Sequence, residues 1–300
     1  MRGGLPGVQR YDLGRVFSPS VATLRAQNVC PVLNRVDQCV LWSPSDLPAA
    51  LQLDSGMARL GLSAEEIALV LRDHAIDVRL LLSHFARADE LEHDFTVQQT
   101  RSVMGIFAEL RQHRPGLRLS LNNSAACLGG VALPAGIEQL GRAGVGLYGG
   151  NPLASGKASD VGLKPVVSVF GKVLQVRGIK AGTPVGYGGT YTAIADERVM
   201  IVGVGYADGV PRHLSNQGHI FVQGKRCAIR GRVSMDMLHA DASKVDVAVG
   251  DWVEVMGANI CVDDIAAQAQ TISYEVFTGL GKRLHRVYRN DSESGLIEGR

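Results

Sequence analysis

The 300-residue sequence lacks any hydrophobic run long enough to cross a membrane. Its longest apolar stretches, such as 199–207, have about nine residues, whereas a membrane-spanning helix needs about 20. Residues 1–6 contain no apolar core of a signal peptide. We therefore expect a cytoplasmic protein that does not bind membranes.

Cysteine and histidine are present, but their spacing does not indicate a disulfide framework or a metal site. The five cysteines are odd in number and far apart, and no two of them form a Cys-x-x-Cys pair. The eight histidines include no His-x-x-x-His pair, so we predict no zinc site. Reduced thiols agree with the expected cytoplasmic location.

A surface of one charge is also lacking. Charged residues make up 20% of the chain, and its formal net charge is +2. Lysine and arginine are scattered along the sequence, which argues against a nucleic-acid-binding surface.

The first half of the sequence alternates short apolar segments with helical patterns. We predict strands at 29–35, 49–53, 77–83, 117–121 and 144–148, and helices at 63–74, 94–113, from Ser124, and at 136–140. Ser63 and Glu66 form a capping-box pattern, whereas 37–48 remains ambiguous because it contains two prolines. This alternation is typical of a parallel sheet.

The predicted architecture is α/β plus β. About five β/α units fit into 1–150, whereas a full (β/α)8 barrel takes at least about 200 residues, so we predict an incomplete barrel that lacks about three units. Residues 151–163 have the composition of a linker, and 164–290 contains short β-branched segments, which predicts a mostly β domain. Residues 291–300 are predicted to be a disordered tail, and the last four, 297–300, resemble a protease-cleavage linker.

Several short motifs do not look like plain core segments. Residues 144–149 match the dinucleotide pattern G-x-G-x-x-G, but Asn151 and Pro152 follow where a helix would be required, so we reject that interpretation. Taken singly, the other motifs have ordinary explanations. Ser124 fits a helix cap, His84 a structural histidine at a strand end, and Tyr187 a packing aromatic.

Taken together, the motifs at 54–59, 83–85, 122–126, 142–145, 185–190, 203–209, 231–237 and 273–275 resemble the alanine racemases. These are enzymes that use pyridoxal 5'-phosphate (PLP) to interconvert L-alanine and D-alanine for bacterial peptidoglycan. The resemblance covers about residues 25–290. It implies an amino-acid isomerase with PLP as cofactor and alanine as substrate.

The resemblance assigns cofactor-binding roles. Arg142 would contact the PLP pyridine nitrogen, and because a guanidinium does not readily release a proton, that nitrogen would stay unprotonated. His84 would pack against the cofactor ring and contact Arg142. The groups that would hold the phosphate are Asn123, Ser124, the backbone N–H groups of Gly144 and Val145, and Tyr274.

The resemblance also assigns substrate and catalytic roles. Arg59 would bind the substrate carboxylate, Met235 would offer its backbone N–H, and Tyr187 would remove the Cα proton of the L-amino acid. An ordinary phenol has a pKa near 10, so nearby cations would have to lower it. In the family this tyrosine reaches the site of the other subunit, which implies a homodimer.

Three further residues would line the substrate entryway: Asp89, Tyr206 and Arg212. At position 52 many relatives have a lysine, often carbamylated. Here it is Gln52, so the orientation of Arg59 would depend on an amide or on a bound anion.

One family motif is missing. The family holds PLP as a Schiff base on a lysine near the start of the barrel, but the first lysine of these 300 residues is Lys157. We expect impaired racemisation from these residues alone. Three hypotheses follow: an alanine racemase without its N-terminal part, a non-catalytic relative that binds PLP or amino acids, or a racemase of serine or a broader set of amino acids.

Overall fold

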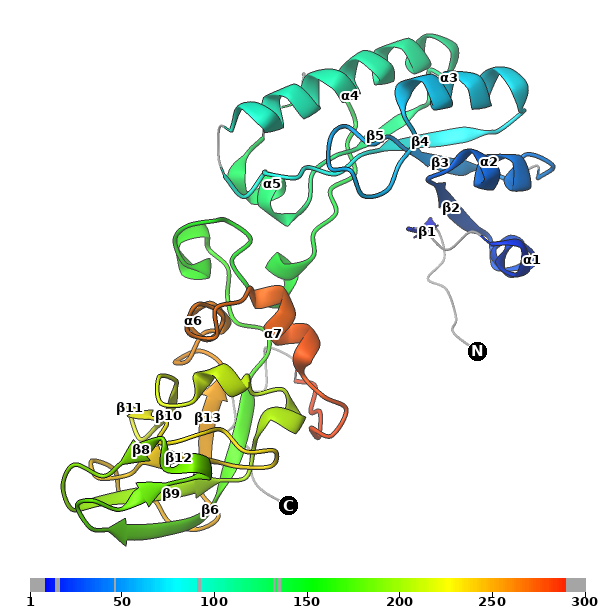
Figure 1. The fold of residues 1–300 in the computed structure, drawn as a ribbon. Coiled ribbons are helices and arrows are strands. Elements are labelled where there is room, and N and C mark those ends of the chain that lie inside the picture. Colours follow the sequence, from blue (N-terminus) through cyan, green and yellow to red (C-terminus); the bar gives the residue numbers. More distant parts are fainter. Residues whose placement is uncertain are drawn as a thin grey trace. The chain divides into compact units, whose positions relative to one another are not determined.

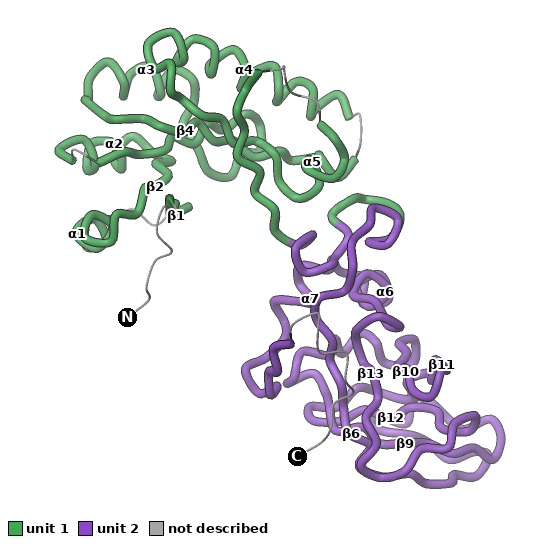
Figure 2. Tube along the Cα trace, turned by 180° about the vertical axis from the view of Figure 1, so that it is seen from behind, with its two compact units in different colours: residues 1–144, 152–156 green, residues 145–151, 157–300 purple. Residues whose placement is uncertain are grey.

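The computed structural model describes residues 9–13, 17–45, 47–90, 93–131, 133 and 136–289 (Figure 1). The chain forms two units (Figure 2): unit 1 comprises 1–144 and 152–156, and unit 2 comprises 145–151 and 157–300. The predicted tail at 291–300 lies outside the described residues.

Unit 1 contains a curled parallel sheet with the strand order β1-β2-β3-β4-β5. Its strands are β1 (Arg10–Asp12), β2 (Val29–Leu33), β3 (Ala49–Gln52), β4 (Val78–Leu82) and β5 (Arg118–Ser120), and its helices are α1 (Ser18–Ala26), α2 (Val36–Trp42), α3 (Ala64–Asp73), α4 (Asp94–His113) and α5 (Ser124–Gly129). Strands that are consecutive in sequence are neighbours, as in a β/α barrel. In Figure 1, α3 and α4 lie on one side of this sheet.

Both faces of the sheet are buried, as is usual for parallel strands. On one face, Leu51 and Leu81 pack in a core that includes Val103 and Phe107 of α4. On the other face, Val32, Ala50, Leu80 and Leu82 form a smaller cluster. The predicted helix at 94–113 is confirmed, and the predicted capping box is present at the start of α3, where the Ser63 side chain accepts from the Glu66 N–H.

The structure resolves one ambiguous segment and contradicts two predicted elements. The ambiguous segment 37–48 contains α2, which ends before the first proline. The predicted helix at 136–140 is wrong, because Gln139 bridges Leu119 and Arg142 bridges Asn123 in parallel, extended geometry. The predicted strand at 144–148 is also wrong. Val145–Tyr148 is a 3-10 helix, and the Gly150 N–H donates back to the Val145 carbonyl at 3.2 Å.

Unit 2 is built on a six-stranded antiparallel sheet with the order β11-β10-β13-β6-β9-β12, together with the small pair β7-β8. The strands are β6 (Val169–Ile179), β7 (Pro184–Val185), β8 (Tyr191–Thr192), β9 (Glu197–Val202), β10 (His219–Val222), β11 (Lys225–Ala228), β12 (Leu238–Asp241) and β13 (Trp252–Met256), and the helices are α6 (Val262–Gln268) and α7 (Ser273–Gly279). The predicted α/β plus β fold class is confirmed. The sequence did not predict β12 and α7.

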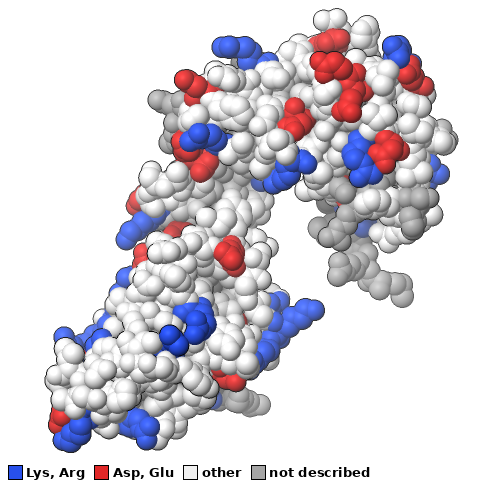
Figure 3. Space-filling view, viewed as in Figure 1, with Lys and Arg blue, Asp and Glu red and all other residues white. Residues whose placement is uncertain are grey.

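The surface carries both charges. On the face shown in Figure 3, acidic and basic side chains lie interspersed over each unit. All seven lysines lie in 157–300, within unit 2. Within the described part of the chain, no helix combines the length and apolar character needed to span a bilayer.

Candidate functional site

Arg142 is the centre of a polar cluster at the carboxyl ends of the strands of unit 1. Its guanidinium donates to the carbonyl oxygen of Ser83 at 2.7 Å, to the carbonyl oxygen of Ser120 at 2.9 Å, and to the Ser120 hydroxyl. It also lies 3.1 Å from Nδ1 of His84. The Ser120 hydroxyl donates in turn to the Leu140 carbonyl. The cation is therefore fixed at the ends of β4 and β5.

The electrostatics of this cluster are unusual, because Arg142 is held by neutral groups. Among the described residues, no carboxylate forms a hydrogen bond or an ion pair with it. Burial lowers the pKa of Arg142 to about 10. Burial and the charges of Arg142 and Arg59 lower the pKa of His84 to about 4, so this imidazole is neutral at pH 7. The site therefore carries uncompensated positive charge and attracts an electron-rich group.

Gln99 was not singled out from the sequence, although it organises this cluster. It lies on the buried side of α4 and is 1% exposed. Its amide nitrogen donates to the Ser55 hydroxyl at 3.0 Å and to the His84 carbonyl at 3.1 Å, and its oxygen accepts from the Ala86 N–H. The hydroxyls of Ser55 and Ser83 lie 2.8 Å apart. The available signal was a glutamine on the apolar face of an amphipathic helix.

The loop that carries Arg59 is held from both ends. One oxygen of Asp54 accepts from backbone N–H groups of the loop, including that of Gly56 at 2.9 Å. The buried amide of Gln52 donates to the carbonyl of Leu60 at 2.9 Å, next to Arg59. The sequence left open whether an amide or a bound anion orients Arg59, and the structure shows that the amide of Gln52 ties down this loop.

Three of the residues predicted to bind phosphate form a second cluster around α5. Asn123, rather than Ser124, caps the helix, since its side chain accepts from the Ala126 N–H at 3.0 Å. The Ser124 hydroxyl oxygen instead accepts from the Gly144 N–H at 2.7 Å. This hydrogen bond leaves the hydroxyl proton of Ser124 free to point toward an anion. The assignment of phosphate binding to Asn123, Ser124 and Gly144 stays a prediction.

Asp89 lies elsewhere in unit 1. Its backbone carbonyl accepts from the Ala154 N–H at 3.0 Å, which ties residues 152–156 to this unit. The Asp89 side chain is half-buried. Its entryway role stays a prediction.

In unit 2 the structure brings together the motifs of Tyr206 and Met235. The Tyr206 N–H donates to the Ser234 carbonyl, and the Ala207 N–H donates to the Met235 carbonyl, both at 3.0 Å. The Asp208 carboxylate accepts from the N–H preceding Tyr206 at 2.9 Å. The side chains of Tyr206 and Met235 both remain exposed, and their roles at the substrate stay predictions.

Tyr187 begins a short 3-10 helix, and its side chain is 70% exposed. The glycines on either side have φ values of 70° and 72°, a conformation that favours glycine. A Cβ at Gly188 would lie 3.1 Å from the guanidinium of Arg232, so this loop is closely packed against a cation. Of the other predicted residues in unit 2, Arg212 begins a separate 3-10 helix, Val145 begins the 3-10 helix 145–148, and Tyr274 lies on α7.

Two family models match the chain. The alanine racemase N-terminal domain matches residues 13–152, and the alanine racemase C-terminal domain matches residues 166–288. An alanine racemase of Rhodospirillum rubrum is 40% identical over 271 residues, which cover 86% of this chain and 70% of that protein. An alanine racemase of Brucella abortus is 34% identical over 306 residues, covering 94% of this chain and 76% of the relative.

Solved structures agree with these matches. The biosynthetic alanine racemase of Pseudomonas aeruginosa superposes with a TM-score of 0.81 at 36% identity, covering 92% of this chain and 77% of that one. The alanine racemase of Bartonella henselae, solved with covalently bound pyridoxal phosphate, gives a TM-score of 0.82 at 30% identity, with coverages of 95% and 80%. The chain therefore belongs to the alanine racemase family, whose members are PLP-dependent isomerases.

Proposed function

We propose that this protein is an alanine racemase, which interconverts L-alanine and D-alanine for peptidoglycan, and that these 300 residues alone perform the reaction poorly. The observation that carries the proposal is Arg142, a buried cation that neutral partners hold at the ends of two parallel strands. No carboxylate of the described residues pairs with this cation. It is suited to meet a ring nitrogen lone pair, which is the role that the resemblance assigns to it.

The residues present fit PLP. The Arg142 guanidinium offers donors to an unprotonated pyridine nitrogen. The neutral imidazole of His84 lies 3.1 Å from this guanidinium. The Ser124 hydroxyl is a donor suited to a phosphate. When bound, PLP delocalises the negative charge that develops at the substrate Cα.

The remaining proposed residues act on the substrate. The Arg59 guanidinium binds the alanine carboxylate, and the Met235 N–H binds the same group. Tyr187 takes or returns the Cα proton on one face. Because Tyr187 is largely exposed in its own chain, we propose that it completes the site of a second copy in a homodimer. Asp89, Tyr206 and Arg212 line the proposed entryway.

A second candidate function is supported by the lysine distribution. Racemisation needs a base on each face of Cα, and no lysine precedes Lys157 in these 300 residues. We propose that these residues alone exchange the Cα proton on one face and racemise alanine poorly. A relative that binds PLP or amino acids without turnover is the alternative that this observation favours.

The test is exchange of the alanine Cα proton into D2O, measured by proton NMR with added PLP and starting from each enantiomer separately. Exchange from L-alanine alone, abolished in Tyr187→Phe, is the expected result. No exchange from either enantiomer, together with retained PLP binding, would favour the non-catalytic candidate. Full racemisation would show that one of the seven lysines supplies the second base.

A further inference from the structure

The segment Val145–Asn151 of unit 2 is a tightly folded loop. Its 3-10 helix is closed by the Gly149 N–H, which donates to Gly146, and by the Gly150 N–H, which donates to Val145, both at 3.2 Å. A Cβ at Gly150 would lie 2.7 Å from a methyl group of Val145 and 3.2 Å from the ring of Phe277. Helix α7 therefore packs directly on this loop.

A single carboxylate joins the end of this loop to the start of α7. Asp263 lies in the first turn of α6, and one of its oxygens accepts from the Asn151 N–H at 3.0 Å and from the Ser273 hydroxyl. The other oxygen accepts from the Ala158 N–H at 3.3 Å. Hydrogen bonds to an ionised carboxylate are stronger and shorter than those between neutral groups. Asp263 thereby ties together three segments that are far apart in sequence.

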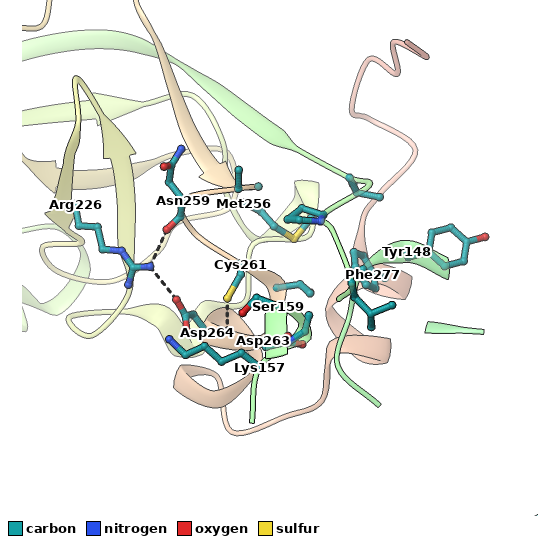
Figure 4. Close-up of a pocket in the computed structure, with 18 residues that line it drawn as sticks. Tyr148, Lys157, Ser159, Arg226, Met256, Asn259, Cys261, Asp263, Asp264 and Phe277 are labelled. Atoms are coloured by element: carbon teal, nitrogen blue, oxygen red, sulfur yellow. Dashed lines mark hydrogen bonds and ion pairs between the residues drawn. The ribbon is translucent and has the colours of Figure 1, made fainter. Parts of the chain in front are cut away.

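A cavity of about 230 Å³ borders this junction, and its lining includes Tyr148, Lys157, Cys261, Asp263 and Phe277 (Figure 4). Side chains that line an open volume lack contact partners there, so van der Waals contacts fix them less firmly. The hydrogen bonds of Asp263 therefore add to the packing of Val145 and Phe277 in fixing the loop relative to α7.

The two segments that Asp263 joins carry two proposed phosphate ligands. Val145 opens the loop that ends at Asn151, and Tyr274 directly follows Ser273. We infer that Asp263 is a positioning residue, which sets the Val145 N–H and the Tyr274 hydroxyl at the separation that the phosphate of PLP requires. This inference rests on the proposed function, because it takes these two groups as phosphate ligands.

Unit 2 offers a matched control for the test. Asp264 lies in the same turn of α6 and carries the same charge, but its side chain pairs with Arg226 at 2.9 Å. Asp263→Ala and Asp264→Ala therefore make the same change in charge and helix-end electrostatics. Only the first removes the acceptor for Asn151 and Ser273.

The experiment measures the affinity of the full 300-residue chain for PLP and for pyridoxal, which lacks the phosphate, by fluorescence titration. We expect Asp263→Ala to weaken PLP binding about tenfold, which corresponds to about 1.4 kcal/mol, and to change pyridoxal binding by less than about twofold. Asp264→Ala should bind both compounds like the parent chain. Ser273→Ala removes one of the donors and should weaken PLP binding about threefold.

The possible outcomes test the proposed phosphate site and the positioning role of Asp263 separately. If the parent chain binds PLP no better than pyridoxal, the proposed phosphate site itself is wrong. If the parent prefers PLP and Asp263→Ala keeps that preference, Asp263 does not position the ligands. Equal losses for PLP and pyridoxal would show general damage to the fold. Should Asp263→Ala fail to fold by circular dichroism, Ser273→Ala decides the question in the same titration.

Discussion

Replacing Gly149 by alanine should destabilise unit 2 far more than the same change at Gly162. Both glycines have positive φ values, of 82° and 74°. The left-handed conformation costs an alanine about 1–2 kcal/mol at either position. The two sites differ in what the new methyl group would meet.

At Gly149 a Cβ would lie 2.2 Å from the backbone oxygen of Lys164 and 2.9 Å from Cα of Pro165. Contacts under 3.0 Å are essentially never seen for a real Cβ, so the backbone must move by about 0.8 Å, and such overpacking adds about 1–3 kcal/mol. At Gly162 the structure places no atom within 4 Å of the added Cβ. We therefore expect losses of about 2–5 kcal/mol for Gly149→Ala and about 1–2 kcal/mol for Gly162→Ala.

The assay is urea unfolding of both variants and the parent chain, followed by far-ultraviolet circular dichroism. Both positions lie in unit 2, so the same transition should shift, with an unchanged dependence on denaturant. Equal shifts for the two variants, within about 0.5 kcal/mol, would refute the argument, because Lys164 would then not confine the loop.

Three further predictions concern single side chains. Burial lowers the pKa of His84 from 6.5 to about 4, so His84 releases its proton on folding and the protein loses stability as the pH drops from 6.5 to 4. In His84→Gln, the slope of the free energy of unfolding against pH should be smaller in that window. An unchanged slope would contradict this prediction. Ser63→Ala removes the cap of α3 and should lower the free energy of unfolding by about 1 kcal/mol, measured by urea titration. An unchanged free energy of unfolding would mean that the capping box does not form in solution. Arg283 is half exposed and bonds to Asp236 at 2.6 Å, so Arg283→Gln should change the free energy of unfolding little. It should nevertheless speed hydrogen exchange at the Tyr206 amide, and unaltered exchange would show that this ion pair does not hold the two loops together.

The fold could be predicted where local sequence and final packing agree. The helix 94–113 has an apolar stripe of the right period, and α3 carries its own capping box. The elements that were missed depend on partners distant in sequence. Strand β12 is short and partly polar, and it exists because Leu238–Asp241 pairs with β9. Helix α7 contains β-branched residues and is stabilised by contacts such as that of Ser273 with Asp263.

The candidate site also combines features that local sequence could predict with features that depend on partners distant in sequence. Motifs singled out candidate residues, and the resemblance predicted that His84 contacts Arg142. Spacing alone could not place them together, because they are 58 residues apart in sequence. The role of Gln99 was not visible for the same reason, since its partners Ser55 and His84 come from two other loops. Ser124 was predicted as a possible cap because it precedes an apolar helix, yet the neighbouring Asn123 has the better reach to the Ala126 N–H.

The division of the chain into units bears on how the protein can be dissected or recombined with relatives. The polypeptide passes between the units three times, after residues 144, 151 and 156. A fragment that starts at Lys157 would leave Asp263 without the Asn151 N–H and Phe277 without the ring of Tyr148, whose centroid lies 5.9 Å away. A chimera joined within 145–156 would graft one parent's loop onto the other parent's helix. Exchanges between homologues should therefore keep Val145–Asn151 and Lys157–Arg289 from the same parent.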